Sequence, residues 1–331
     1  MRITKETLIR IAKETVQKRA FADPELVAAY LTGSLRTEYP FLGNAADIDL
    51  VFVHAGEPKV RREIVPVTPE IHLDIIHNPR SEYEKPKELR VHPWLGPELY
   101  DPTPLHNPQH FFEFVQAGVR DKYHEPVNVL ARARKNAEHA RQIWSDLPLS
   151  QDTGPALLLP YLKAVSHAAN AIAVLTSVPL AERRFQLQFP ALAEAAEAPG
   201  LTVELDALIG ADKADRELLG GYVSEWHKDF LEAAGRPKVE ARIAAPRLAY
   251  YNLAFESMLT SETPQAILWP LVHTWTLAAL ALPPMHQAKW QAAMTTLGLV
   301  GVDFGDRLDG LDHFLDTVDE LLENRAASQG L

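Results

Sequence analysis

The chain has 331 residues, 47% of them hydrophobic, which is enough to build about two or three packed units. Its formal net charge of −11 argues against a long nucleic-acid partner, because binding DNA or RNA relies on a basic surface. The absence of cysteine excludes thiol catalysis, thiolate metal sites and disulfides. With no signal-peptide core at its start and no apolar run of membrane-spanning length, we expect a cytoplasmic protein without a membrane segment.

Three strands are expected near the start of the chain. Apolar residues at helical spacing predict a helix over residues 4–20, and an apolar run predicts a strand at 27–31. Further strands are predicted over 47–54 and 70–77, while residues 59–65 form either a strand or a loop.

The next segment is rich in proline. Seven prolines between residues 79 and 108 predict an irregular connection with one short strand near Tyr100 and no helix. The rest of the chain is predicted to be helical over 109–120, 126–147, 157–178, 190–198, 203–219, 221–234, 246–260, 264–282, 285–297 and 308–325.

These elements predict an α+β protein with two domains. A small mixed-sheet domain covers residues 1–122, and a larger all-helical domain covers residues 123–331. The helical domain could divide further into residues 123–200 and 201–331. The cleft between such units is a common place for an active site.

Three aspartates stand at chemically informative places in these strands. Asp47 and Asp49 open one strand two residues apart, so their side chains project from the same face. If the strand that holds Asp74 is a neighbour, its carboxylate comes within roughly 5 Å of one of the pair. Carboxylates that close repel one another unless a cation such as Mg²⁺ joins them. The pattern therefore predicts a magnesium site, and the alternative is three separate surface aspartates.

A Gly-Ser pair follows the first strand. Gly33 allows a tight turn and close backbone approach, and residues 35–38 can begin a helix directly after it. The free N–H groups of that turn, together with the Ser34 hydroxyl, would face a phosphate. Arg36 could add a charged contact, or it could simply be solvated.

Gly33, Ser34, Asp47, Asp49 and Asp74 together resemble the motif of the nucleotidyltransferase superfamily that includes DNA polymerase β. Within it, the chain is most similar to bacterial small-molecule nucleotidyltransferases of the aminoglycoside adenylyltransferase kind.

A second likeness is the run from Glu98 to Pro102, which is similar to a strand that closes the catalytic domain in such proteins. The motifs cover about residues 25–105. The loop at 39–42 and the proline-rich segment depart from the family's pattern.

The resemblance implies a metal-dependent reaction. A nucleoside monophosphate, with AMP from ATP as the favoured case, would pass to a hydroxyl of a small molecule, releasing pyrophosphate. It implies a two-magnesium site in which Asp47 and Asp49 are ligands and Asp74 is a ligand or general base. It also implies that Gly33 and Ser34 hold phosphate.

In its layout the segment 157–189 also resembles these enzymes, where a basic residue after a turn meets the phosphates. Arg183 or Arg184 would take that role, and Lys163 is another candidate. The alternative for the arginines is a solvated basic pair. His72 should share the face of Asp74 and His77 should lie opposite, with packing favoured over a transition-metal site.

Two other functions remain open at this point. One is a non-catalytic or antitoxin-like protein that keeps the fold for nucleotide sensing or complex formation. The other is nucleotidyl transfer to a protein target. The intact set of three aspartates favours the enzyme. The acceptor, the preferred base and the oligomeric state are not encoded in any pattern that we recognise.

Overall fold

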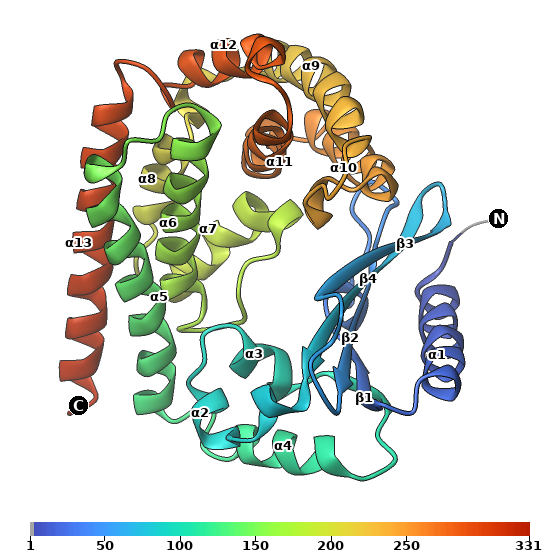
Figure 1. Cartoon of the computed structure of the whole chain (residues 1–331). Coiled ribbons are helices and arrows are strands. Elements are labelled where there is room, and N and C mark those ends of the chain that lie inside the picture. The colour runs from blue at the N-terminus through green and yellow to red at the C-terminus, as the bar shows by residue number, and fades with distance from the viewer. Residues whose placement is uncertain (1–2) are drawn as a thin grey trace.

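The computed structural model describes residues 3–331 and contains a five-stranded mixed sheet followed by a larger helical region (Figure 1). The predicted α+β class is confirmed. The sheet half consists of α1 (Lys5–Ala22), β1 (Leu26–Leu31), β2 (Ile48–His54), β3 (Arg62–Thr68), β4 (Ile71–Pro79), α2 (Pro86–Arg90), α3 (Leu95–Tyr100), β5 (Thr103–His106) and α4 (Phe111–Arg120).

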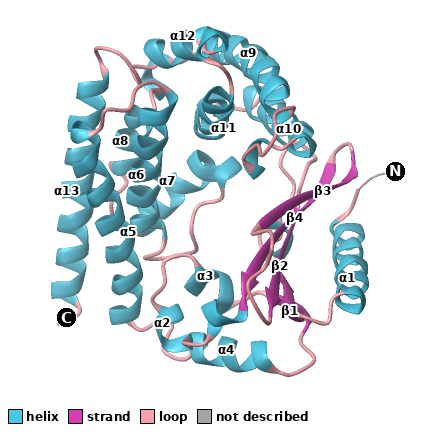
Figure 2. Ribbon diagram, viewed as in Figure 1, coloured by secondary structure: helices cyan, strands magenta, loops and turns pink. Residues whose placement is uncertain are grey.

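The helical half follows without a further strand among the described residues (Figure 2). It consists of α5 (Pro126–Asp146), α6 (Pro155–Ala173), α7 (Phe185–Ala195), α8 (Leu201–Leu208), α9 (Arg216–Ala234), α10 (Leu248–Leu259), α11 (Leu268–Ala281), α12 (Ala288–Thr296) and α13 (Phe304–Ser328). Long helices α5, α6 and α13 pack side by side (Figure 1). Within residues 3–331 no helix has both the length and the apolar character that crossing a membrane requires.

The sheet has the strand order β3-β4-β2-β1-β5, and β2 and β4 are its parallel pair. Alternate side chains of β2 pack in two different hydrophobic cores, one on each face of the sheet. Ile48, Leu50 and Phe52 pack toward α1, whereas Val51 and Val53 pack in the cluster that includes residues of α2, α3 and α4. Because of this period of two, any odd-numbered side chain of β2 points away from α1.

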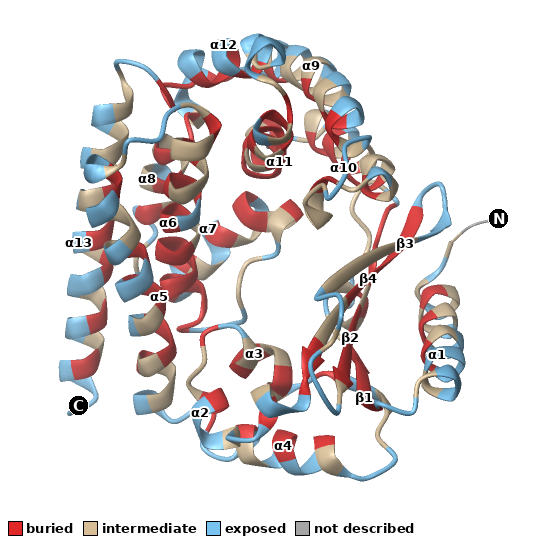
Figure 3. Cartoon of the chain, viewed as in Figure 1, coloured by how far each residue is buried: buried red, intermediate tan, exposed pale blue. Residues whose placement is uncertain are grey.

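The helical half has its own core. Buried residues of α5 to α13 form one cluster, which also includes Ala45 from the loop before β2. Buried positions follow the inner strands and the inward sides of the long helices (Figure 3). This loop therefore packs on the helical half while β2 belongs to the sheet. The domain limits expected from the sequence stay a prediction.

The proline-rich segment is more regular than predicted. It contains helices α2 and α3, and its strand lies at Thr103–His106 rather than at Tyr100, so the predicted strand over residues 98–102 is wrong. Prolines do not prevent these helices, because Pro86 begins α2 and Pro97 lies in the first turn of α3, where backbone N–H groups need no helical partner. The His92 Nδ1 atom accepts from the N–H groups of Trp94 and Leu95 and so supports the start of α3.

Two predicted helices are also wrong. The helix expected after Gly33 is a single 3-10 turn at Ser34–Arg36, because Thr37 donates both its N–H and its hydroxyl to the Ser34 carbonyl and leaves in an extended conformation. The helix expected over 203–219 is interrupted at Gly210, whose φ of 78° is left-handed. A new helix starts after Asp215, whose side chain accepts from the Leu218 N–H.

Candidate functional site

Asp47, Asp49 and Asp74 converge on the sheet face that points away from α1. β2 and β4 are parallel neighbours whose register places Asp49 directly beside Asp74. One ligand oxygen from each of the three carboxylates lies within 4.8 Å of the other two. Asp47 and Asp74 are buried, and Asp49 is half-buried. The convergence predicted from the strand pattern is confirmed, and the cluster could hold a metal ion.

Gly33 lies against the Asp49 carboxylate. Its backbone has φ 69° and ψ −157°, a conformation that only glycine adopts readily. A Cβ atom there would fall 1.8 Å from Asp49 Oδ2, which no side chain could tolerate without moving the carboxylate. The Thr32 N–H also donates to the Asp49 carbonyl at 3.0 Å, which ties the end of β1 to the start of β2. The Gly-Ser turn therefore packs directly on the carboxylate cluster.

Next to this glycine, the Ser34 hydroxyl is buried and has no hydrogen-bond partner among the described residues. Buried hydroxyl groups in folded proteins normally have a partner. The protein therefore leaves the hydrogen-bonding capacity of this oxygen unused.

Two arginines balance most of the negative charge. Arg62 of β3 donates two hydrogen bonds to Asp74, from Nε to Oδ1 at 2.8 Å and from Nη2 to Oδ2 at 2.6 Å. Arg247, in the turn Ala245–Arg247 before α10, donates from Nη1 to Asp74 Oδ2 at 2.7 Å and lies 3.6 Å from Asp47 Oδ2. Three carboxylates thus face two guanidinium groups, one from the sheet and one from the helical half.

Sequence reasoning missed both arginines. Arg62 stood in a short charged segment that also suited a surface loop, and Arg247 lay at the start of a predicted helix. No local pattern connects a residue near position 247 with an aspartate at position 74. Such a contact could be found only from the tertiary structure.

The surroundings shift the two neighbouring carboxyl groups in opposite directions. Burial, followed by repulsion from Asp47 and Asp74, raises the pKa of Asp49 well above its usual range. Burial also opposes the charge of Asp74, but the hydrogen bonds from Arg62 and the charge of Arg247 outweigh it and lower the pKa of Asp74. A carboxylate that holds its charge this firmly is better suited to be a ligand than a general base near neutral pH.

His72 and His77 lie on opposite faces of β4, as predicted. His72 is fully buried with its ring edge-to-face on Tyr250, and burial lowers its pKa to about 4, so it is neutral at physiological pH. His77 bonds to His54 at 2.9 Å and to Glu63 at 3.2 Å on the side facing α1. These contacts agree with a packing role for both rings.

Arg183 and Arg184 hold the loop that leads into β2. The buried Arg183 guanidinium donates to the carbonyls of Ala45 at 3.2 Å and Tyr250 at 2.9 Å, and it stacks on the Tyr250 ring. Arg184 donates to the carbonyls of Tyr39 and Pro40. Both arginines thereby fix the loop of residues 39–45, which leads into Asp47. Their predicted contact with a nucleotide phosphate stays a prediction.

The remaining predicted residues make other contacts. Arg36 pairs with Asp101 at the end of α3, so its charge is already engaged. Lys163 projects from α6 into a cavity lined mainly by the helical half. Their roles toward a nucleotide also stay predictions.

Comparisons of the whole sequence with known proteins leave the family of this chain open. No protein-family model and no curated protein matches it. The resemblance to nucleotidyltransferases therefore rests on the five motif residues. Ser34, Asp49 and Asp74 lie in the turn and strands described above, and Gly33 and Asp47 directly precede the turn and β2. The structure itself establishes a carboxylate cluster that could bind a metal.

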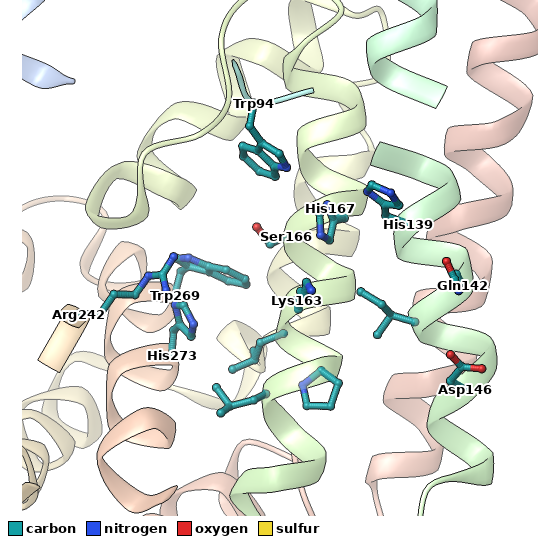
Figure 4. A pocket seen from close by; sticks show the side chains of 14 residues that line it. Trp94, His139, Gln142, Asp146, Lys163, Ser166, His167, Arg242, Trp269 and His273 are labelled. Carbon is teal, nitrogen blue, oxygen red and sulfur yellow. The ribbon is translucent and has the colours of Figure 1, made fainter. Parts of the chain in front are cut away.

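A cavity of about 940 Å³ lies beside α5 and α6 (Figure 4). Trp94, just before α3, contributes to its wall from the sheet half. Trp269 and His273 contribute from α11, and Arg242 from the turn Ala241–Ile243. A space of this size is typical of sites for small molecules.

Proposed function

We propose that this protein is a metal-dependent nucleotidyltransferase that transfers AMP from ATP to a hydroxyl group of a small molecule and releases pyrophosphate. The observation that carries the proposal is the convergence of Asp47, Asp49 and Asp74 within 4.8 Å beside the Gly33 turn. Closely spaced carboxylates at a largely buried position are unfavourable unless cations accompany them.

The donor set suits Mg²⁺. All three groups offer carboxylate oxygens, which hard divalent cations prefer. The unpartnered Ser34 hydroxyl belongs to the residue that follows Gly33. Bound by these aspartates, Mg²⁺ would supply positive charge for the triphosphate and its departing pyrophosphate. The family resemblance implies a second ion in the same site.

The chain's own residues would position the reactants. Gly33 lets the backbone lie close to Asp49, and Ser34 offers a hydroxyl to a phosphate oxygen. Arg62 and Arg247 orient Asp74 and keep it ionised. During transfer the acceptor hydroxyl gives up its proton to a carboxylate of the cluster or to water, and its oxygen bonds to the α-phosphorus. The bond from that phosphorus to pyrophosphate breaks, and pyrophosphate leaves. Such chemistry depends mainly on positioning and charge.

The same two arginines favour a second candidate. Because Arg62 and Arg247 already compensate Asp74, the site can be stable without any metal. A non-catalytic protein that senses nucleotides or forms complexes would retain such a site. Transfer to a protein target is the remaining alternative for an active enzyme.

Titration with Mg·ATP distinguishes the two candidates. We expect the wild-type protein to bind Mg·ATP, and we expect Asp49→Asn to lose that binding together with pyrophosphate release from labelled ATP in the presence of hydroxyl acceptors. Asp316→Asn, a change at an exposed aspartate of α13, is the matched control and should behave like the wild type.

Mg·ATP binding without pyrophosphate release for any acceptor would favour the sensing role. Absence of Mg·ATP binding would refute both transfer from ATP and ATP sensing, and would leave complex formation as the remaining role. Equal binding by Asp49→Asn would refute a metal-bridged site.

A further inference from the structure

The cavity beside α5 and α6 is lined by two indole side chains and by apolar residues. Trp94 and Trp269 lie on different sides of it (Figure 4), and Leu159, Pro160 and Leu162 line it from α6. Trp269 is held firmly, because it stacks on Phe185 with ring centroids 3.9 Å apart. Trp94 is 37% exposed, an unusual state for a tryptophan. Aromatic walls of this kind suit a flat ring.

Lys163 is the available cation of this cavity. Its side chain lies in the middle of the view in Figure 4, and among residues 3–331 no carboxylate is within ion-pair distance of its amine. Arg242, by contrast, is engaged by Glu182 at 3.5 Å and Glu240 at 3.2 Å. The lining carboxylate, Asp146, ends α5 at the edge of the same view. An anionic group of a ligand would therefore be drawn to Lys163.

His167 adds a hydrogen-bond acceptor. Its Nδ1 atom lies 3.3 Å from the Asn136 amide oxygen, and that amide is oriented by the contact of its nitrogen with the Arg132 carbonyl. Nδ1 therefore carries the proton, and Nε2 is left as an acceptor. A hydroxyl group on the ligand would be a suitable donor to it.

The cavity and the carboxylate cluster are joined by a continuous set of contacts. Glu182 accepts from His273 of the cavity wall at 2.9 Å and from the Tyr251 hydroxyl at 3.4 Å. The Arg247 guanidinium lies 5.8 Å from the centre of the Tyr251 ring and bonds to Asp74. These contacts place the cavity on the side of the sheet where the three aspartates converge.

We propose that this cavity binds the acceptor, and that the acceptor is a hydroxylated organic acid whose flat ring lies against Trp94 and Trp269 and whose carboxylate or phosphate meets Lys163. This proposal rests on the proposed nucleotidyl transfer. It differs from the family resemblance, which pointed to aminoglycosides. A polycation would bring its amines beside Lys163 and Arg242, where like charges repel.

Binding of matched ring compounds tests the charge preference. Calorimetry would compare para-hydroxybenzoate with para-hydroxybenzyl alcohol and tyramine, and pyridoxine phosphate with pyridoxine. We expect at least one anion to bind about tenfold or more tightly than its neutral and cationic analogues, since a charge-assisted hydrogen bond is the stronger kind. The two series separate a carboxylate from a phosphate ligand. Three outcomes would overturn the proposal. They are equal affinities within both series, a preference for tyramine, and no binding by either anion.

Variants locate the bound anion. Lys163→Gln should weaken its binding about tenfold, and Trp94→Ala should weaken the anion and its neutral analogue alike. Lys18→Gln, a change at an exposed lysine of α1, is the matched control and should have no effect. Unchanged affinity in Lys163→Gln would overturn the proposal.

Mg·ATP titrations separate this proposal from the function on which it rests. This proposal assigns Lys163 to the acceptor in place of the nucleotide contact that the family resemblance suggested. Lys163→Gln should therefore bind Mg·ATP as tightly as the wild type. A parallel loss of Mg·ATP affinity would assign the cavity to the nucleotide, overturning the acceptor role while leaving nucleotidyl transfer intact. Anion binding by a wild-type protein that binds no Mg·ATP would refute the transfer reaction and, with it, the acceptor role.

Discussion

Within the part of the chain that the structure describes, two groups of three aspartates surround arginine, and they differ mainly in their surroundings. In the sheet, Asp47, Asp49 and Asp74 face Arg62 and Arg247, and the Arg247 and Asp74 side chains are only 5% and 3% exposed. On α13, Asp312, Asp316 and Asp319 surround Arg141 of α5 at 2.6, 2.8 and 2.9 Å. There the Arg141 side chain is 29% exposed and that of Asp316 is 65% exposed.

The difference shows that composition alone does not make a site. On α13 the aspartates follow one face of a helix, and water screens their charges. In the sheet, the strand register forces Asp49 beside Asp74 where screening is weak. Among the described residues, the sheet cluster is the group of metal-ligand side chains whose atoms converge. The predicted effects of mutation should therefore be large in the sheet and small on α13.

The largest effect is expected for Arg247→Met. Without Arg247, Asp47 loses its guanidinium partner and Asp74 keeps Arg62 alone, so three clustered carboxylates face one cation. Breaking a buried ion pair in this way should cost about 3–5 kcal/mol in the free energy of unfolding. Added Mg²⁺ should restore part of this loss, because the metal would replace the missing positive charge. Urea denaturation with and without Mg²⁺ measures both effects. If Mg²⁺ restored none of the lost stability, the charge of Arg247 would have no connection with a metal site at the aspartates.

Gly33→Ala should have the next largest effect. A side chain in this backbone conformation costs about 1–3 kcal/mol, and its Cβ would also displace the Asp49 carboxylate. We therefore expect lower stability together with weaker Mg²⁺ binding by calorimetry. Gly220→Ala is the matched control, because a Cβ there meets no other atom within 4 Å. Undiminished Mg²⁺ affinity in Gly33→Ala would mean that Asp49 is not a ligand.

Asp49→Asn should stabilise the metal-free protein. The pKa of Asp49 is raised on folding, so ionising this group costs stability as pH rises from its ordinary value near 3.8 through the raised pKa. The variant should gain on the order of 1–2 kcal/mol at neutral pH in the presence of a chelator. For the same reason, Mg²⁺ affinity of the wild type should fall on acidification before an ordinary carboxyl group would be protonated. Thermal melts and Mg²⁺ titrations across this pH range test both statements; a destabilised variant would contradict the repulsion.

The smallest effect is expected for Arg141→Gln. Surface ion pairs contribute little, and the free energy of unfolding should change by less than about 1 kcal/mol, with still less difference at high salt. Mg²⁺ binding should be unchanged. A loss comparable to that of Arg247→Met would show that burial does not distinguish the two clusters.

Several features of the site follow from local patterns. The alternation of β2 and β4 placed three aspartates on one face, and a glycine after an apolar run marked the turn that packs on them. Short-range signals failed where long-range contacts compete with them. Glu98 belongs to a helix whose start is supported by His92, and its carboxylate accepts a hydrogen bond from Tyr30, 68 positions earlier.

The α+β class, the strand faces and the carboxylate triad could be predicted from the residues alone, because they depend on periods of two and 3.6 residues that neighbouring side chains reveal. Three features required the folded chain: Arg62 and Arg247 neutralise Asp74, Arg183 and Arg184 hold the loop before β2, and Lys163 faces a cavity with two tryptophans. These contacts join segments up to 173 positions apart, and the electrostatic and packing energies that select them depend on distance in space rather than along the chain.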